Sequence, residues 1–178
     1  FVDNDVALWA ILTEDTITGF TINGAWTNIW TTDVGPFTYR VYWLRRSGAP
    51  NLTVSWTTSH YWESVIIASS GCVTTGTPID ASAAGTPTTI QDVDPPAITI
   101  GTADTLAYVF GTNWAGYGAT AAPTNYTNRF SPGTAFDQVI ASRTIAATGS
   151  ENPDAFGAAL ASDSACGFTL ALRSVAPA

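Results

Sequence analysis

The sequence contains no lysine and no methionine, and only three glutamate and two glutamine residues among its 178 positions. Apart from alanine and leucine, the residues that most favour helices are therefore nearly missing. Threonine occurs 28 times, beside seven tryptophan, six tyrosine and eight phenylalanine residues. Because β-branched and aromatic side chains suit the half-buried surface of a pleated sheet, this composition predicts an all-β protein.

Positive charge is also scarce, because six arginines and one histidine stand against fourteen acidic residues. With a net charge of −8, we expect no nucleic-acid partner and no anionic membrane partner, since both attract positive surfaces. No apolar stretch approaches the ~20 residues that span a bilayer. The chain opens without a basic and then apolar leader, so we expect that any targeting segment was removed or never present.

Charged residues make up only 11% of the chain, so its surface rests mainly on threonine, serine, asparagine and glycine. Lone domains usually keep apart through interspersed charges, and lysine is a common guard of exposed sheet edges. We therefore expect a homo-oligomer or an assembly with other proteins, with at least one interface above ~1,000 Å² of total buried area.

Two halves of the chain, 4–72 and 103–176, repeat one another weakly around a crossover at 73–102. The matching parts are 5–9 (ending in Trp9) with 104–108 (ending in Tyr108), 26–30 with 126–130, and Phe37 and Arg45 with Phe136 and Arg143. In this alignment Trp26 is equivalent to Tyr126. A repeat this long predicts two related half-sheets, or twin lobes that share one core. We expect a single domain, 1–178, that buries roughly 70% of its unfolded surface.

Alternating apolar and polar residues predict the strands, and the pattern is cleanest from Leu52 to Thr57. The expected strands lie near 5–13, 17–23, 25–31, 36–46, 51–57, 61–70, 97–101, 104–111, 125–131, 136–146, 155–160 and 165–174. Glycine and proline clusters separate them. Many short strands, short turns and one long crossover predict an antiparallel β-sandwich of jelly-roll-like topology.

Several packing and turn motifs carry a resemblance to a known family. They are Tyr61-Trp62, Val65-Ile66-Ile67-Ala68, Gly71, Thr77-Pro78-Ile79-Asp80-Ala81 and the closing run Phe168-Thr169-Leu170-Ala171-Leu172-Arg173. Together they resemble a family of β-sandwich virion proteins of tailed bacteriophages. The resemblance implies a capsid decoration protein or a tail-fibre or adhesin module, located in the virion or outside the cell. It brings no catalytic residues, and Cys72 stands where an ordinary small or apolar residue is expected.

The segment 111–130 is the best candidate for binding, and we interpret it as an exposed, glycine-rich loop between strands. Its candidate residues are Asn113, Trp114, Tyr117, Asn125 and Tyr126. Aromatic faces beside amide groups suit sugar rings, and they also suit protein partners. The alternative is a long loop that folds its own aromatic side chains over the end of the sandwich.

The sequence offers no catalytic constellation. His60 is the only histidine, so no second histidine completes a metal site, and nothing nominates an activated serine and a partner acid. Glycoside hydrolysis needs two carboxylates on one face, but the glutamates Glu14, Glu63 and Glu151 are scattered. We expect Glu63 to guard the edge of its predicted strand against aggregation. The chain is therefore not expected to be an enzyme.

Two acidic clusters contain the hard oxygen ligands that calcium prefers. Asp3-Asn4-Asp5 and Asp92-Val93-Asp94-Pro95-Pro96 each lack a full ligand set in sequence, and aspartate beside proline is common in turns. We therefore expect no metal and no cofactor.

The two cysteines, Cys72 and Cys166, flank the closing strands of the two halves. If those strands lie antiparallel side by side, the two sulfur atoms can form a disulfide. The alternative is two small, buried, apolar side chains.

Six large side chains are expected to face the core, namely Trp9, Trp43, Trp56, Leu106, Phe168 and Leu170. The leading hypothesis is a non-enzymatic structural component of a phage virion, which acts through contacts with like subunits or other virion proteins. The alternative is a carbohydrate- or receptor-binding adhesin module that uses the segment 111–130.

Overall fold

A computed structural model of the chain describes residues 4–14, 18–47, 53–57, 61–117, 120–131 and 136–175. Within these ranges it contains fourteen β-strands, all paired antiparallel, and no helix, so the predicted all-β class is confirmed. The same ranges accordingly hold no helix that is long and apolar enough to cross a membrane. The chain divides into two compact units, 1–72 (unit 1) and 73–178 (unit 2), and each is described by itself. That the two units form one domain stays a prediction.

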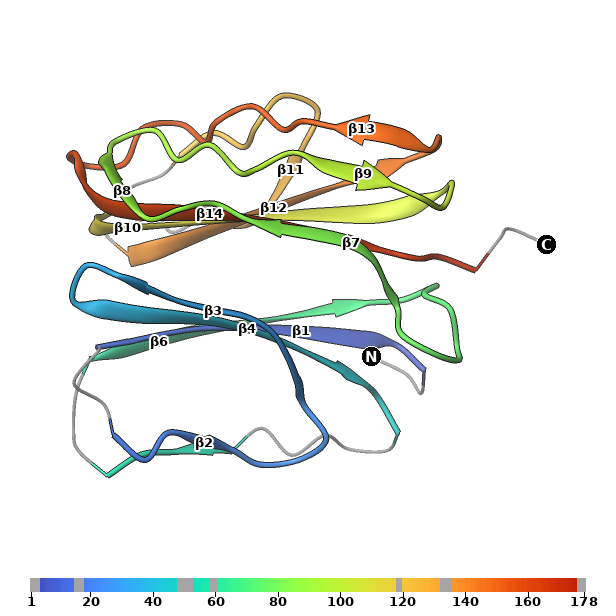
Figure 1. Ribbon diagram of the computed structural model, residues 1–178, viewed down its shortest axis with the longest axis horizontal. Coiled ribbons are helices and arrows are strands. Elements are labelled where there is room, and N and C mark those ends of the chain that lie inside the picture. Colours follow the sequence, from blue (N-terminus) through green and yellow to red (C-terminus); the bar gives the residue numbers. More distant parts are fainter. Residues whose placement is uncertain are drawn as a thin grey trace. The chain divides into compact units, whose positions relative to one another are not determined.

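Unit 1 is built on a four-stranded sheet with the strand order β3-β4-β1-β6. These strands are β1 (Val6–Glu14), β3 (Thr27–Val34), β4 (Phe37–Arg45) and β6 (Trp62–Ser69). A short ribbon of β2 (Thr21–Ile22) and β5 (Val54–Ser55) lies across one face of the sheet (Figure 1).

An apolar cluster fills the space between the sheet of unit 1 and its ribbon. Its buried members are Ala7, Trp9, Ile11, Trp26, Tyr42 and Leu44, and Phe20, Ile22 and Val54 pack against them. The rings of Trp9 and Trp26 lie 5.1 Å apart. Because side chains alternate along a strand, the intervening residues of β1 occupy the other face. Leu8 and Leu12 there are also buried, which explains why β1 reads as a continuous apolar run.

Unit 2 is built on a larger sheet with the order β11-β12-β10-β14-β7, and β8 also pairs with β14. The strands are β7 (Ile79–Ala84), β8 (Thr88–Ile90), β10 (Thr105–Tyr117), β11 (Thr127–Phe130), β12 (Phe136–Ile145) and β14 (Asp163–Leu172). A ribbon of β9 (Ile98–Ile100) and β13 (Gly149–Glu151) lies over one face (Figure 1).

The core of unit 2 lies between this sheet and the segments that cover it. Its buried members include Val93, Ile98, Ile100, Ala107, Val109, Val139, Phe156 and Ala171. Glycines let the cover approach the sheet closely. A Cβ on Gly111 would lie 3.0 Å from a ring carbon of Phe156, and a Cβ on Gly167 would lie 2.8 Å from the Cα of Pro95.

The corresponding strands of the two units have the same order, β3-β4-β1-β6 in unit 1 and β11-β12-β10-β14 in unit 2. Trp26 directly precedes β3, Tyr126 directly precedes β11, and both belong to the apolar cluster that faces the ribbon. The shared order agrees with the predicted repeat. An origin by internal duplication and a jelly-roll topology stay predictions.

The residue-by-residue alignment of the halves is wrong in two places. Trp9 faces the ribbon of unit 1, whereas in β10 the neighbours Ala107 and Val109 belong to the ribbon-side cluster of unit 2, so Tyr108 lies on the opposite face. A slip of one residue moves a side chain to the other face of a sheet. Arg143 pairs with Ala107, and Leu44 pairs with Ala7. Arg143 therefore corresponds to Leu44 and not to Arg45.

Several strand predictions are also corrected. The crossover 73–102 was expected to contain only one strand, near its end, but it contributes β7 and β8 to the sheet as well as β9. Alanine and serine dominate β7, so its intrinsic strand preference is weak. The strand expected at 155–160 is absent from that described stretch, and β13 lies earlier, at Gly149–Glu151. The strands expected at 17–23 and 51–57 shrink to two residues each among their described positions, and Leu52 lies outside them.

The six expected core residues fall into two groups. Trp9, Phe168 and Leu170 are fully buried, and the other three, Trp43, Trp56 and Leu106, are half-buried. None of the six is exposed. Trp56 directly follows β5 of unit 1, and its ring lies 5.4 Å from that of Trp62.

Candidate functional site

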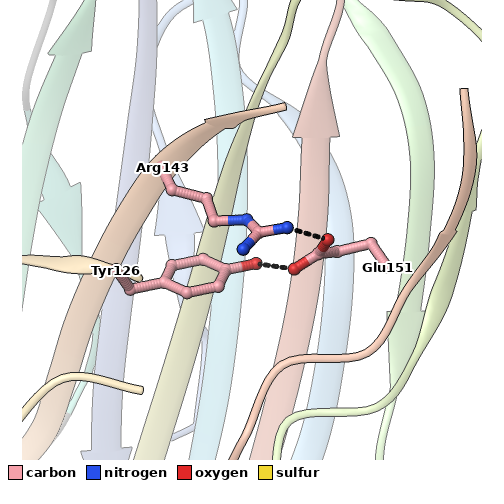
Figure 2. Close-up of polar contacts among 3 residues, drawn as sticks. All are labelled: Tyr126, Arg143 and Glu151. Atoms are coloured by element: carbon pink, nitrogen blue, oxygen red, sulfur yellow. Dashed lines mark hydrogen bonds and ion pairs between the residues drawn. The ribbon is translucent and has the colours of Figure 1, made fainter. Parts of the chain in front are cut away.

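A polar cluster joins three segments of unit 2 (Figure 2). Tyr126 precedes β11, Arg143 lies on β12 and Glu151 ends β13. The Tyr126 hydroxyl donates a hydrogen bond to Glu151 Oε1 at 2.9 Å, and Arg143 Nη2 donates to Glu151 Oε2 at 2.5 Å. The guanidinium carbon of Arg143 also lies 5.3 Å from the centre of the Tyr126 ring. The ribbon of unit 2 is thus tied to the sheet by a carboxylate.

The Glu151 and Tyr126 side chains of this cluster are shielded from water. Glu151 is 5% exposed and Tyr126 is 8% exposed. Burial raises the pKa of the Tyr126 hydroxyl, and the hydrogen bond to Glu151 raises it further, so this group stays a neutral donor. Arg143 supplies the positive charge that a buried carboxylate requires. Because both oxygen atoms of Glu151 are engaged, the arrangement suits an anchor better than a general acid or base.

The structure corrects the prediction of an exposed loop at 111–130. β10 continues to Tyr117, so Asn113, Trp114 and Tyr117 lie on a strand. Asn113 and Tyr117 are completely buried, and Tyr126 belongs to the polar cluster. Only Trp114, which is 41% exposed, and Asn125 reach the surface. A binding role for these two residues stays a prediction.

Asn113 uses its amide group inside the fold. Its Nδ2 donates to the carbonyl oxygen of Ile90 at 2.8 Å, and its Oδ1 accepts from the backbone N–H of Ala115 at 2.8 Å. This residue stands where the pairing of β10 with β12 shifts register, between Thr112 and Tyr117. The amide therefore replaces ladder hydrogen bonds at an irregular point of the strand.

Both cysteines are buried, and each is a free thiol within its own unit. The Cys166 thiol donates to the carbonyl oxygen of Gly85 at 3.1 Å, and the Cys72 thiol lies 3.8 Å from the carbonyl oxygen of Ser69. Burial raises the pKa of each thiol to about 11. Cys72 belongs to unit 1 and Cys166 to unit 2, so the disulfide between them stays a prediction that the separate units do not test.

Glu63 lies on the edge strand β6, as expected, but its side chain is only 7% exposed. The Tyr61 hydroxyl donates to Glu63 Oε2 at 3.2 Å. A buried carboxylate does not present a charge to an approaching strand, so its expected role as an edge guard is wrong.

Among the described residues, no three His, Cys, Asp or Glu side chains form a group that could hold a metal ion. Asp3 and His60 lie outside those residues.

The edge of β6 exposes large apolar side chains, a feature that the sequence did not predict. β6 ends the sheet of unit 1. Three large apolar side chains are exposed along it: Tyr61 (45%), Trp62 (45%) and Ile66 (39%). Glu63 is the only charged residue of the strand. The apolar run 65–68 predicted the strand, and Glu63 suggested an edge position, but the sequence did not show which side chains the strand exposes.

Comparisons of the chain with protein-family models, with curated proteins and with solved structures gave no match.

Proposed function

We propose that the chain is a non-enzymatic structural component of a phage virion, a capsid decoration or tail-associated protein that acts through protein–protein contacts. The observation that carries this proposal is the edge of β6, which exposes apolar side chains and no charged one. The residues 61–62 and 65–68, on which the resemblance to phage virion proteins partly rests, form most of that same strand.

An edge of this kind is costly for a protein that works alone. Unpaired backbone groups at the edge of a sheet attract other strands, and soluble proteins usually guard them with charges, proline or a bulge. β6 pairs with β1 over eight residues without a register shift, and it contains no proline and no exposed charge. Exposed tryptophan, tyrosine and isoleucine side chains are also typical of contact surfaces. A partner that covers this edge removes the liability.

Two of the three glutamates, Glu63 and Glu151, support the non-enzymatic part of the proposal. Glu63 accepts a hydrogen bond from Tyr61 and Glu151 is held by Arg143 and Tyr126, and both side chains are buried. Each of these acids serves an internal contact. Neither is placed to receive a substrate proton.

Purified virions from the phage or lysogen that encodes the chain test this function. We expect the protein to co-purify with the particles at a fixed ratio to the major shell or tail protein. Washing the particles at high salt removes proteins that only adhere to them. A soluble host protein is the control, because the wash should remove it. Absence of the chain from washed particles contradicts the proposal.

Trp114 favours a second candidate, a carbohydrate-binding or receptor-binding module, because its ring is 41% exposed near the end of β10. A glycan array with the purified protein tests it. Millimolar or tighter binding that is lost in Trp114→Ala but kept in Trp62→Ala supports this candidate. A blank array removes it.

A further inference from the structure

The outer side of β6 presents unpaired backbone groups. The backbone N–H of Glu14 donates to the carbonyl oxygen of Tyr61 at 3.2 Å, so Tyr61 directs its backbone toward β1. Successive residues of a strand direct these groups to opposite sides, and Glu63, Val65 and Ile67 therefore also face β1. The residues that face outward are Trp62, Ser64, Ile66 and Ala68. No strand of the described chain pairs with that side.

Unit 2 shows what can occupy this place. β14 lies beside β10 as β6 lies beside β1, and β7 pairs antiparallel with the outer side of β14. With that cover, β14 is buried continuously from Ala165 to Leu172, whereas β6 alternates between buried and exposed residues. The shared strand order thus accepts one more antiparallel strand here, and unit 1 has none among its described residues.

We propose that β6 pairs antiparallel with β6 of a second copy of the chain, about a two-fold axis through Val65. This pairing rests on the proposed function and names the partner of the same edge. It places Trp62 opposite Ala68 of the copy and Ser64 opposite Ile66 of the copy. Val65 then lies opposite Val65 of the copy, and every outward-facing residue gains a backbone partner. The two sheets become one continuous sheet.

The side chains of β6 suit this register. The large Trp62 meets the small Ala68 of the copy, and Ile66 meets Ser64, so each exposed apolar group has room beside a small neighbour. A strand whose large residues meet its own small residues when two copies pair antiparallel can form an isologous contact, in which both copies use the same surface.

Charge also favours a second copy at this edge. Each chain carries a net charge of −8, so two copies repel wherever acidic surfaces meet. β6 contains a single charged residue, Glu63, which is 7% exposed and is engaged by Tyr61. In the proposed register Glu63 lies opposite Ile67 of the copy, so no like charges face each other across the pair.

Cysteine cross-linking of the full chain tests both the partner and the register. In Val65→Cys the two new thiols lie directly opposite across the axis, in a pair with a Cα separation of ~4.5 Å, which a disulfide can bridge. Ile67→Cys is the matched control, because it changes the same strand and the same face but lies opposite Glu63 of the copy. Under a mild oxidant we expect a covalent dimer from Val65→Cys and no more than the wild-type background from Ile67→Cys. The native thiols, both buried, set that background.

Sedimentation of the purified protein at micromolar concentration provides the second measurement. We expect a species of twice the 18.6 kDa of one chain. Ser64→Lys adds a charge to an outward-facing residue, as natural edge strands do, and we expect it to weaken dimerisation at least tenfold. Thr75→Lys adds the same charge at an exposed loop residue and is expected to leave the dimer unchanged. Circular dichroism checks that each variant is folded.

The outcomes separate this inference from the proposed function. A wild-type monomer at micromolar concentration, or a dimer that Ile67→Cys cross-links as well as Val65→Cys, overturns the pairing even when the chain is found in washed virions. Conversely, a specific Val65→Cys dimer together with absence from virions supports the pairing and removes the virion role.

Discussion

Trp26 and Tyr126 hold the same place in the two units, directly before the outer strand of the sheet and facing the ribbon. In unit 1 the ring of Trp26 packs against Trp9, and Leu44 lies in the same cluster. In unit 2 the hydroxyl of Tyr126 bonds Glu151, and Arg143 stands where unit 1 has Leu44. One unit fastens its ribbon with apolar packing and the other adds a buried ion pair.

The difference shows that the strand order does not depend on the kind of contact that joins the ribbon to the sheet. Apolar packing stabilises in proportion to the area removed from water. A buried ion pair must first offset the loss of hydration of both charges, so its net contribution is small, although the loss of one partner is costly. The apolar contacts of unit 1 should therefore stabilise the protein more than the ion pair of unit 2. The ion pair should be more sensitive to a change of charge.

The largest expected effect is that of Trp26→Ala in unit 1. Removal of a buried aromatic side chain costs about 3–5 kcal/mol of unfolding free energy, and Trp26 is only 9% exposed. Denaturant unfolding followed by circular dichroism measures this cost. Trp114→Ala is the matched control, because its ring is 41% exposed, and a cost below about 1 kcal/mol is expected. Equal costs for both variants contradict a core role for Trp26.

Glu151→Gln tests the ion pair of Arg143 and Glu151 in unit 2. The amide keeps the shape of the side chain but leaves Arg143 without its counter-charge, and breaking a buried pair in this way costs about 3–5 kcal/mol. Because the Arg143 side chain is 28% exposed, we expect about 2–3 kcal/mol, since water screens part of the loss.

The double variant Arg143→Leu/Glu151→Leu sharpens this comparison by giving unit 2 the apolar chemistry of unit 1. It should cost less than Glu151→Gln alone, because replacement of both charges leaves no buried ion without a partner. A double variant that costs the sum of its two single variants would show that the pair is not coupled.

The sequence revealed the strands better than it revealed their arrangement. β1, β4, β6 and β14 carry long apolar or alternating runs, so local pattern alone located them within a few residues. β7 was missed because its small residues lack strand preference, and it forms because β14 supplies its hydrogen-bond partners. Pairing between distant segments overrode local preference there.

The candidate sites were harder to predict for the same reason. Glycines at 111 and 116 suggested a loop, but Gly111 lies on a strand where Phe156 leaves no space for a side chain. Glu151 comes from a three-residue strand, and its partner Tyr126 is 25 positions earlier. Spacing along the chain carries no signal for such a meeting. The exposed edge of β6 depends on the order of strands in the sheet, which is set by long-range pairing.

Alkaline pH should weaken both units through their thiols. Burial raises the pKa of Cys72 and of Cys166 from 9.0 to about 11. Their contribution is fully present below the ordinary pKa, and it is lost as the pH rises through the folded value, because the unfolded chain releases the protons first. Between about pH 9 and about pH 11 each thiol should cost about 2–3 kcal/mol.

Unfolding in denaturant over this pH range measures the loss, and Cys72→Ala and Cys166→Ala are each expected to reduce it. Every tryptophan except Trp114 lies in unit 1, so fluorescence follows that unit and circular dichroism follows both. A decline that neither substitution changes would assign the effect to the tyrosines, since burial also raises the pKa of Tyr117 and Tyr126.

A smaller effect is expected at the place where the cover of unit 2 crosses β14. A Cβ on Gly167 would lie 2.8 Å from the Cα of Pro95 and 3.0 Å from the carbonyl oxygen of Asp94. These are backbone atoms that cannot rotate away, so Gly167→Ala should cost about 1–3 kcal/mol by overpacking. Gly101→Ala is the control in denaturant unfolding, because its nearest neighbour, an Asp80 carboxylate oxygen, lies 3.6 Å away.

Unit 1 completes this last comparison. Gly167 of β14 pairs with Gly111 of β10. The corresponding residue of unit 1 is Ser64 of β6, which pairs with Ile11 of β1. Ser64 carries a side chain and is only half-buried, so Ser64→Ala should change the unfolding free energy by no more than about 0.5 kcal/mol. If Gly167→Ala proves equally mild, the crossing at Pro95 is not tight, and the glycine must be explained by something other than the close approach of the two backbones.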